Sequence, residues 1–287
     1  MLPAAVRKQV GVAYLLFRVA DTIEDSTTVG GREKLRLLGE LGKLLQAADE
    51  VHDEWKSLAC VLQQTATTNN AADACLFRQT ARVVASACYF EPTVRTIILR
   101  RVRKSALGMR QFLSRGNVTG NIRLNSHREL CDYCYCVAGT VGEMLTELFL
   151  QHDPQLASSR SSLMSDAVGF GEALQLVNIL KDSDNDHREG RCFIPANVAR
   201  ESLMEQARAK IEVAENYIQT LIEHDADDGI IRFSTFPVLL ASLTLERVQA
   251  DGPGAKVCRE DVFRILGNLS PPNSIADEHG VVGEPKA

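Results

Sequence analysis

Two pairs of aspartates, each on an apolar segment, restrict the fold of this chain more than any other feature. The pairs are Asp21 with Asp25 and Asp182 with Asp186, four positions apart in each case. Residues at that spacing lie on one face of an α-helix, about 6 Å apart along its axis. Two like charges so close together destabilise an apolar helix unless cations or water compensate them. We therefore expect two helices whose aspartates meet cations or solvent.

Polar residues precede each aspartate pair on the same helix face. Tyr14 and Arg18 share the face of the first pair, and Gln175 and Asn178 share that of the second. The flanking residues are apolar, so both helices are predicted to be largely buried: Val12, Leu15, Leu16, Val19, Leu176, Val177, Ile179 and Leu180. Mg²⁺ is commonly held by one or two carboxylates together with substrate phosphates. Two facing pairs would clamp Mg²⁺ and a diphosphate; the alternative is that each pair lies on a solvated helix face.

The composition argues against several classes of protein. The 287 residues are 45% hydrophobic, which is enough for a large core in one domain or two. The net charge is −5 and no basic block occurs, so a nucleic-acid partner is not expected. No apolar run reaches the roughly 18–20 residues that span a bilayer, and the amphipathic N-terminal segment is unlike a signal peptide. We expect a cytoplasmic protein without a transmembrane segment.

Three of the eight cysteines, Cys131, Cys134 and Cys136, lie close together and raise the question of a zinc site. No fourth soft ligand follows at zinc-finger spacing, and His127 alone is a poor substitute. Small buried thiols in a cytosolic helical protein are therefore expected instead.

Helical periodicity dominates the chain and strand-like alternation is nearly absent, so the fold class is all-α. Glycines at 30 and 31 separate the first two helices, Pro92 suits a first helical turn, and Ser126 with Glu129 forms a capping box. The predicted helices span residues 4–25, 32–48, 54–65, 72–89, 92–116, 126–151, 162–186, 195–223 and 231–250.

Two further stretches leave alternatives open. The charged segment His187–Arg191 is either a flap beside the second aspartate pair or an ordinary loop. Glycines inside apolar helices, which cost about 1 kcal/mol each relative to alanine, indicate either close helix packing or room for an apolar ligand: Gly139, Gly142, Gly169 and Gly171. Residues 270–287 are polar and rich in glycine and proline, and are predicted to form a loose tail.

Three motifs resemble those of the squalene/phytoene synthase family. Asp-Thr-Ile-Glu-Asp at 21–25, with Arg18 before it, is similar to the first aspartate-rich motif of the family. Residues 175–195 are similar to the second motif, and residues 133–142 to the central Tyr…Val-Ala-Gly-x-Val-Gly segment. The motifs occur in the order and at the spacing of the family, and the resemblance covers about residues 2–248.

The resemblance implies an isoprenoid synthase fold, a single large helical domain (1–269) around a central cavity, followed by the tail. The family usually begins with an extra helix, and we expect this chain to start after it. Lys181 stands where the family frequently has arginine.

The reaction implied by the resemblance is the Mg²⁺-dependent head-to-head condensation of two prenyl diphosphates. The motifs look closer to the squalene side, with two farnesyl diphosphates giving presqualene diphosphate or squalene. The alternatives are a phytoene-type synthase that uses geranylgeranyl diphosphate, another terpene synthase, and a non-catalytic assembly or partner protein. Mn²⁺ could replace Mg²⁺, and NADPH would be needed for squalene. Transient contact with a membrane surface would aid product release.

The resemblance also assigns roles to residues. The metal ligands would be Asp21, Asp25, Asn178, Asp182 and Asp186. The residues that bind diphosphate would be Arg18, Gln175, Lys181 and Arg191. Tyr14 and Tyr133 would act in catalysis together with Arg18, Asp21 and Asp182.

Overall fold

The computed structural model describes residues 1–26, 28–47, 52–65, 70–116 and 121–269, and these residues form helices without any strand. The helices are α1 (Ala4–Asp25), α2 (Gly31–Gln46), α3 (His52–Thr65), α4 (Ala71–Cys88), α5 (Pro92–Arg115), α6 (His127–Cys134), α7 (Thr140–His152), α8 (Arg160–Arg188), α9 (Arg200–Glu223), α10 (Asp228–Asp251) and α11 (Arg259–Asn268). A π-helical turn, Tyr135–Gly139, joins α6 to α7, and a 3₁₀-helix, Pro154–Ser159, precedes α8. The all-α prediction is confirmed.

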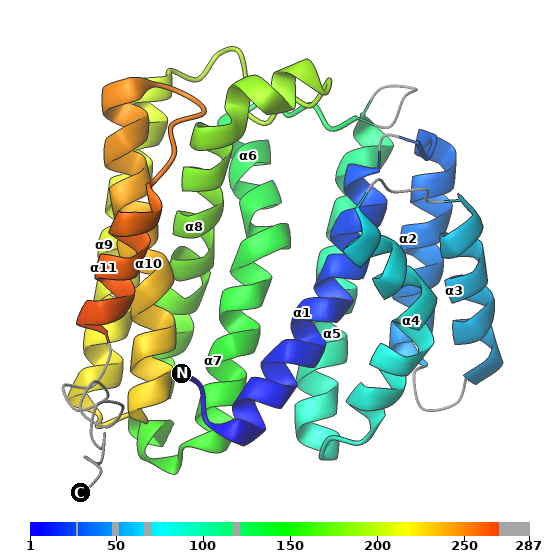
Figure 1. The fold of residues 1–287 in the computed structure, drawn as a ribbon, viewed down its shortest axis with the longest axis horizontal. Helices are drawn as coiled ribbons and strands as arrows, with labels where there is room; N and C mark the ends of the chain where they lie inside the picture. Colours follow the sequence, from blue (N-terminus) through cyan, green and yellow to red (C-terminus); the bar gives the residue numbers. More distant parts are fainter. Residues whose placement is uncertain (27, 48–51, 66–69, 117–120, 270–287) are drawn as a thin grey trace, which may run out of the picture.

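The helices gather in two halves (Figure 1). Helices α1 to α5 form one half, in which α1 packs against α4 and α5, and α2 against α5. Helices α6 to α11 form the other, in which α8 lies against α7, α9 and α10. One continuous apolar core runs through both halves. The two aspartate segments therefore lie in different halves, α1 in the first and α8 in the second.

Helix α1 has the predicted bounds, and its apolar face enters the core through Leu16, Val19 and Ile23. The prediction that the flanking residues are buried is wrong for Leu15, which is exposed. Several other boundaries also differ. Residues 126–151 are not one α-helix, because the π-helical turn interrupts them.

The second aspartate helix is longer than predicted. Residues 187 and 188 belong to α8, and Gly190, with a φ of +83°, ends the helix in the left-handed conformation that glycine adopts without strain. The segment after it runs beside residues 121–125, because Cys192 donates to the Ile122 carbonyl at 2.9 Å and accepts from the Leu124 amide at 2.9 Å. Pro195 then begins a short turn, which the Val198 amide closes by donating to the Pro195 carbonyl at 3.0 Å, and α9 starts only at Arg200.

Helix α11 was not predicted. It has ten residues and buries only Ile265. The expectation of buried thiols is also wrong for Cys60, Cys75 and Cys258, which are exposed. The predicted tail, residues 270–287, lies outside the described part of the chain.

Close packing explains the glycines of α7 and α8. A Cβ atom on Gly142 would overlap the carbonyl oxygen of Ala167, and one on Gly171 would overlap that of Ala138. A Cβ on Gly169 would lie 2.7 Å from Val213. The sequence left two interpretations of these glycines open, and the structure favours close helix packing at these positions.

Among the described residues, α10 is the one helix long and apolar enough to cross a bilayer by length and composition. It packs against α8 and α9 within the bundle and contains Pro237.

Candidate active site

A polar cavity of about 480 Å³ lies between α1 and α8. Its walls come from α1, from α6 with the π-helical turn, from α8 and from the segment after α8. The lining residues are Arg18, Asp21, Glu24, Asp25, Tyr133, Val137, Gln175, Asn178, Ile179, Lys181, Asp182, Asp186, Arg191 and Phe193. Every site residue predicted from the sequence is among them except Tyr14.

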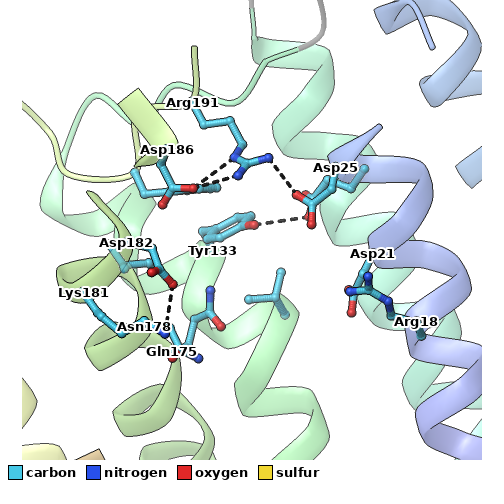
Figure 2. A pocket seen from close by; sticks show the side chains of 14 residues that line it. Arg18, Asp21, Asp25, Tyr133, Gln175, Asn178, Lys181, Asp182, Asp186 and Arg191 are labelled. Atoms are coloured by element: carbon cyan, nitrogen blue, oxygen red, sulfur yellow. Dashed lines mark hydrogen bonds and ion pairs between the residues drawn. The ribbon is translucent and has the colours of Figure 1, made fainter. Parts of the chain in front are cut away.

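The two aspartate pairs lie on opposite sides of this cavity. Figure 2 shows Asp21 and Asp25 on α1, with Asp182 and Asp186 across from them on α8. About 160 positions separate the pairs in sequence, and the helix spacing turns each pair towards the same space. Asn178 lies about one turn and Gln175 about two turns before Asp182 on α8, and both line the same wall.

The carboxylates of the first pair are short of compensating charge. Burial, followed by repulsion from Asp25, raises the pKa of Asp21 from its ordinary value of 3.8 to about 7. Burial also raises the pKa of Asp25 and that of Asp186, and in both cases the Arg191 guanidinium opposes the shift. The cavity therefore favours the binding of positive charge beside these carboxylates.

Two cations already touch the carboxylates. Arg191 lies between the halves, with Nη1 at 3.3 Å from Oδ1 of Asp25 and Nη2 at 2.8 Å from Oδ1 of Asp186. Lys181 Nζ lies 3.2 Å from Oδ2 of Asp182. Among the ion pairs of the described residues, none involves Asp21.

Arg18, predicted to contact diphosphate, has a protein partner. Its Nε and Nη2 donate to the two carboxylate oxygens of Asp73 on α4, at 3.0 and 2.9 Å. This two-point contact fixes the plane of the guanidinium. This contact could not be predicted from the sequence, because Asp73 has no motif around it and lies 55 positions away.

Tyr133 is held rigidly at the back of the cavity. Its ring stacks on Phe193 at 5.0 Å between centroids and meets the edge of Phe112 at 5.4 Å. Its hydroxyl donates to Oε2 of Glu24 at 3.3 Å, and burial followed by the nearby Glu24 raises the tyrosine pKa well above its ordinary value. The other oxygen of Glu24 is buried without a hydrogen-bond partner.

Two further residues line the site but were not predicted from the sequence, Glu24 and Phe193. Glu24 stands inside the first motif, directly before Asp25, and that position was the available signal. Phe193 lies in the second motif, but only the tertiary fold brings its ring onto Tyr133.

Tyr14 does not line this cavity, and its role in catalysis stays a prediction. Its side chain is 64% exposed. It does lie on the same helix face as Asp25, but eleven residues separate them, or about 16 Å along the axis. The cavity begins only at Arg18.

An apolar cavity of about 530 Å³ adjoins the polar one. Asn178 and Lys181 of α8 line both. The remaining walls come from α8, α10 and the segment through the start of α11: Leu174, Val177, Phe236, Pro237, Leu240, Ala241, Thr244, Lys256, Val257 and Val262. A polar head group and a hydrocarbon chain of one ligand could therefore occupy neighbouring spaces.

Sequence comparison identifies the family. The model of the squalene/phytoene synthase family matches residues 1–227, which is most of the chain. The chain belongs to the squalene/phytoene synthase family.

Curated members of the family resemble it at modest identity. Squalene synthase of Bos taurus is 30% identical over 197 residues, which cover 68% of this chain and 41% of the relative. Squalene synthase of Schizosaccharomyces pombe is 27% identical over 200 residues, covering 69% and 40%. Phytoene synthase of Thermus thermophilus is 37% identical over 81 residues, 28% of this chain and 25% of the relative. The matches to the squalene synthases span about two fifths of their length.

Solved structures show the same fold. A ligand complex of TcSQS superimposes with a TM-score of 0.70 at 22% identity, covering 93% of this chain and 80% of the other. A dehydrosqualene synthase complex gives a TM-score of 0.50 at 17% identity, covering 92% and 86%. The predicted isoprenoid synthase fold is confirmed.

The donor set of the cavity suits a hard divalent cation. The facing groups are carboxylate and amide oxygens, and burial, followed by repulsion from Asp25, raises the pKa of Asp21. Within the described ranges, no three His, Cys, Asp or Glu side chains are grouped as a ready-made metal centre. A cation bound in the cavity would thus take its ligands from two separate walls, α1 and α8.

Proposed function

We propose that this protein condenses two prenyl diphosphates head to head in a reaction that requires Mg²⁺. One observation carries the proposal: carboxylate pairs on α1 and α8 line opposite walls of one polar cavity, and an apolar cavity adjoins it. A prenyl diphosphate has an anionic head and a long hydrocarbon chain, and these need two such environments side by side.

The residues that would hold Mg²⁺, or Mn²⁺ in its place, are Asp21, Asp25, Asn178, Asp182 and Asp186. When bound, the metal would supply Lewis-acid stabilisation of the charge on the diphosphate leaving group. Arg191 and Lys181 would bind diphosphate oxygens from the α8 side, the guanidinium through two parallel hydrogen bonds. Gln175 would orient the same head group through its amide.

The first chemical step breaks the bond between C1 and the diphosphate oxygen, and the bonding electrons leave with diphosphate. The allylic cation that remains is attacked by the double bond of the second substrate, and loss of a proton closes a cyclopropane ring. The ring of Tyr133, immobilised by Phe112 and Phe193, would stabilise positive charge through its face. The apolar cavity would keep water from the cation.

Farnesyl diphosphate is the favoured substrate, with presqualene diphosphate or squalene as product. The support is the similarity to squalene synthases over about two thirds of the chain. Conversion to squalene would also consume NADPH. A phytoene-type reaction with geranylgeranyl diphosphate is the second candidate, favoured by the stronger local identity with a phytoene synthase.

The test is to incubate the purified protein with Mg²⁺ and either the C15 or the C20 diphosphate, with and without NADPH, and to identify the lipid formed. A C30 product from the C15 substrate supports the favoured reaction, and a C40 product from the C20 substrate supports the second. Absence of any coupled product from a folded protein would reject both and support a non-catalytic role.

A further inference from the structure

The Arg191 guanidinium joins the two walls of the polar cavity. It lies 3.3 Å from Asp25 on α1 and 2.8 Å from Asp186 on α8, and its Nε also donates to Asp186 at 3.2 Å. A third carboxylate, that of Glu189, lies 2.7 Å from Nη2. The Arg191 side chain is 18% exposed, so solvent screens these ion pairs only in part.

The backbone holds Arg191 in position for this contact. Its own amide donates to the Asp186 carbonyl at 2.8 Å, and the next residue, Cys192, is bonded on both sides to residues 122 and 124. Gly190 before it has a φ of +83°, and a Cβ there would lie 2.5 Å from Nδ2 of Asn121. The guanidinium therefore starts from a fixed turn, which lowers the entropy lost in bridging the carboxylates.

No other cation of the described residues makes a bridge of this kind across the cavity. Lys181 contacts Asp182 on its own helix, and Arg18 is bound to Asp73. Lys34 donates to the backbone carbonyl of Glu24 at 2.6 Å. Arg191 thus supplies the positive charge that two of the four aspartates contact directly when no ligand is present.

We propose that Arg191 is an internal counter-cation, which holds Asp25 and Asp186 in the free protein and must release them before a divalent cation binds. The proposal rests on the proposed function for the identity of that cation. The guanidinium contacts Oδ1 of both aspartates, so a metal ion bound to these atoms would lie against it and the two positive charges would repel. Metal binding therefore displaces Arg191, and the freed guanidinium becomes available for an anion.

Substitution of Arg191 tests the competition directly. The probe is Mn²⁺ alone, titrated into the purified protein by calorimetry with no diphosphate present. We expect R191M to bind Mn²⁺ at least about fivefold more tightly than the wild type, because two partly buried ion pairs no longer compete with it. Without metal, R191M should also unfold at a lower temperature than the wild type. Mn²⁺ should then raise the unfolding temperature of R191M by more than it raises that of the wild type.

Two further variants separate the bridge from general electrostatics. R188M removes an equal charge nearby, from an exposed side chain that donates to the Asp184 carbonyl at 3.2 Å, and should change Mn²⁺ affinity by less than about twofold. R191K keeps the charge but lacks the planar fork of donors that contacts both carboxylates, so its affinity should lie between those of the wild type and R191M. If R191M does not fold, the Mn²⁺ affinity of R191K still tests the proposal.

The proposal is overturned if R191M and R191K bind Mn²⁺ no more tightly than the wild type, or if R188M tightens binding as much as R191M. These measurements need no prenyl substrate. If R191M binds Mn²⁺ more tightly but the wild-type protein forms no coupled lipid, the role of Arg191 as a counter-cation stands. Only the proposed reaction is then rejected.

Discussion

Replacing Gly171 with alanine should separate two helices that now touch through their backbones. The new Cβ would lie 2.6 Å from the carbonyl carbon of Ala138 and 3.1 Å from the amide nitrogen of Gly139, and it would overlap the Ala138 oxygen. Every one of these atoms belongs to the main chain of the π-helical turn. Rotation of a side chain cannot relieve the overlap, so α8 must move away from that turn.

The expected loss of stability follows from two opposing effects. Overpacking costs about 1–3 kcal/mol, and contact with fixed backbone places this site near about 3 kcal/mol. Alanine in place of glycine inside a helix stabilises the folded protein by about 1 kcal/mol. The net loss is about 2 kcal/mol. With an unfolding entropy of about 2.1 cal/mol/K for each of the 287 residues, or about 0.6 kcal/mol/K in total, Tm should fall by about 3 °C.

The assay is thermal unfolding followed by far-ultraviolet circular dichroism, with Gly11→Ala as the matched control. Gly11 also lies inside a helix, α1, but no atom comes within 4 Å of a Cβ built there. Its substitution should raise Tm by about 2 °C through helix propensity alone. A Gly171→Ala protein as stable as the wild type, beside a stabilised Gly11→Ala protein, would show that the two backbones are not in close contact.

Three more predictions concern the cavity. Asp21→Asn and Asp182→Asn should each reduce turnover by at least about a hundredfold while the circular dichroism spectrum stays unchanged, and near-normal rates in either variant would contradict the ligand roles. Chelation by EDTA should abolish turnover, and Mg²⁺ or Mn²⁺ should restore it; full activity in EDTA would exclude metal-assisted ionisation. Mg²⁺ and inorganic diphosphate together should raise Tm by more than the sum of their separate shifts, whereas additive shifts would indicate separate sites.

The sequence predicted those parts of the site that depend on helix periodicity. A spacing of four residues orients Asp21 with Asp25, and Asp182 with Asp186, whatever the rest of the fold does. Periodicity could not show how far along α1 the cavity extends, and Tyr14, on the same helix face, is outside its lining.

Contacts that depend on tertiary structure could not be predicted from the sequence. The position of Arg191 depends on the turn at Gly190 and on the pairing of Cys192 with residues 122 and 124. The partner of Arg18, Asp73, comes from a helix without a motif. Helix boundaries failed for a related reason. Pro195 suits a first helical turn, but in the structure it begins a separate short turn that the Val198 amide closes.

The pairing of Cys192 with Ile122 and Leu124 has a mechanical consequence. Residues 121–125 lead directly into α6, whose N-cap is Ser126 and which carries Tyr133. The turn that bears Arg191 is thus fastened to the same body as Tyr133 and α8, and α1 belongs to the other half of the molecule. Any separation of the two halves would therefore stretch the contact between Arg191 and Asp25, whereas the contact between Arg191 and Asp186 would move with its own wall.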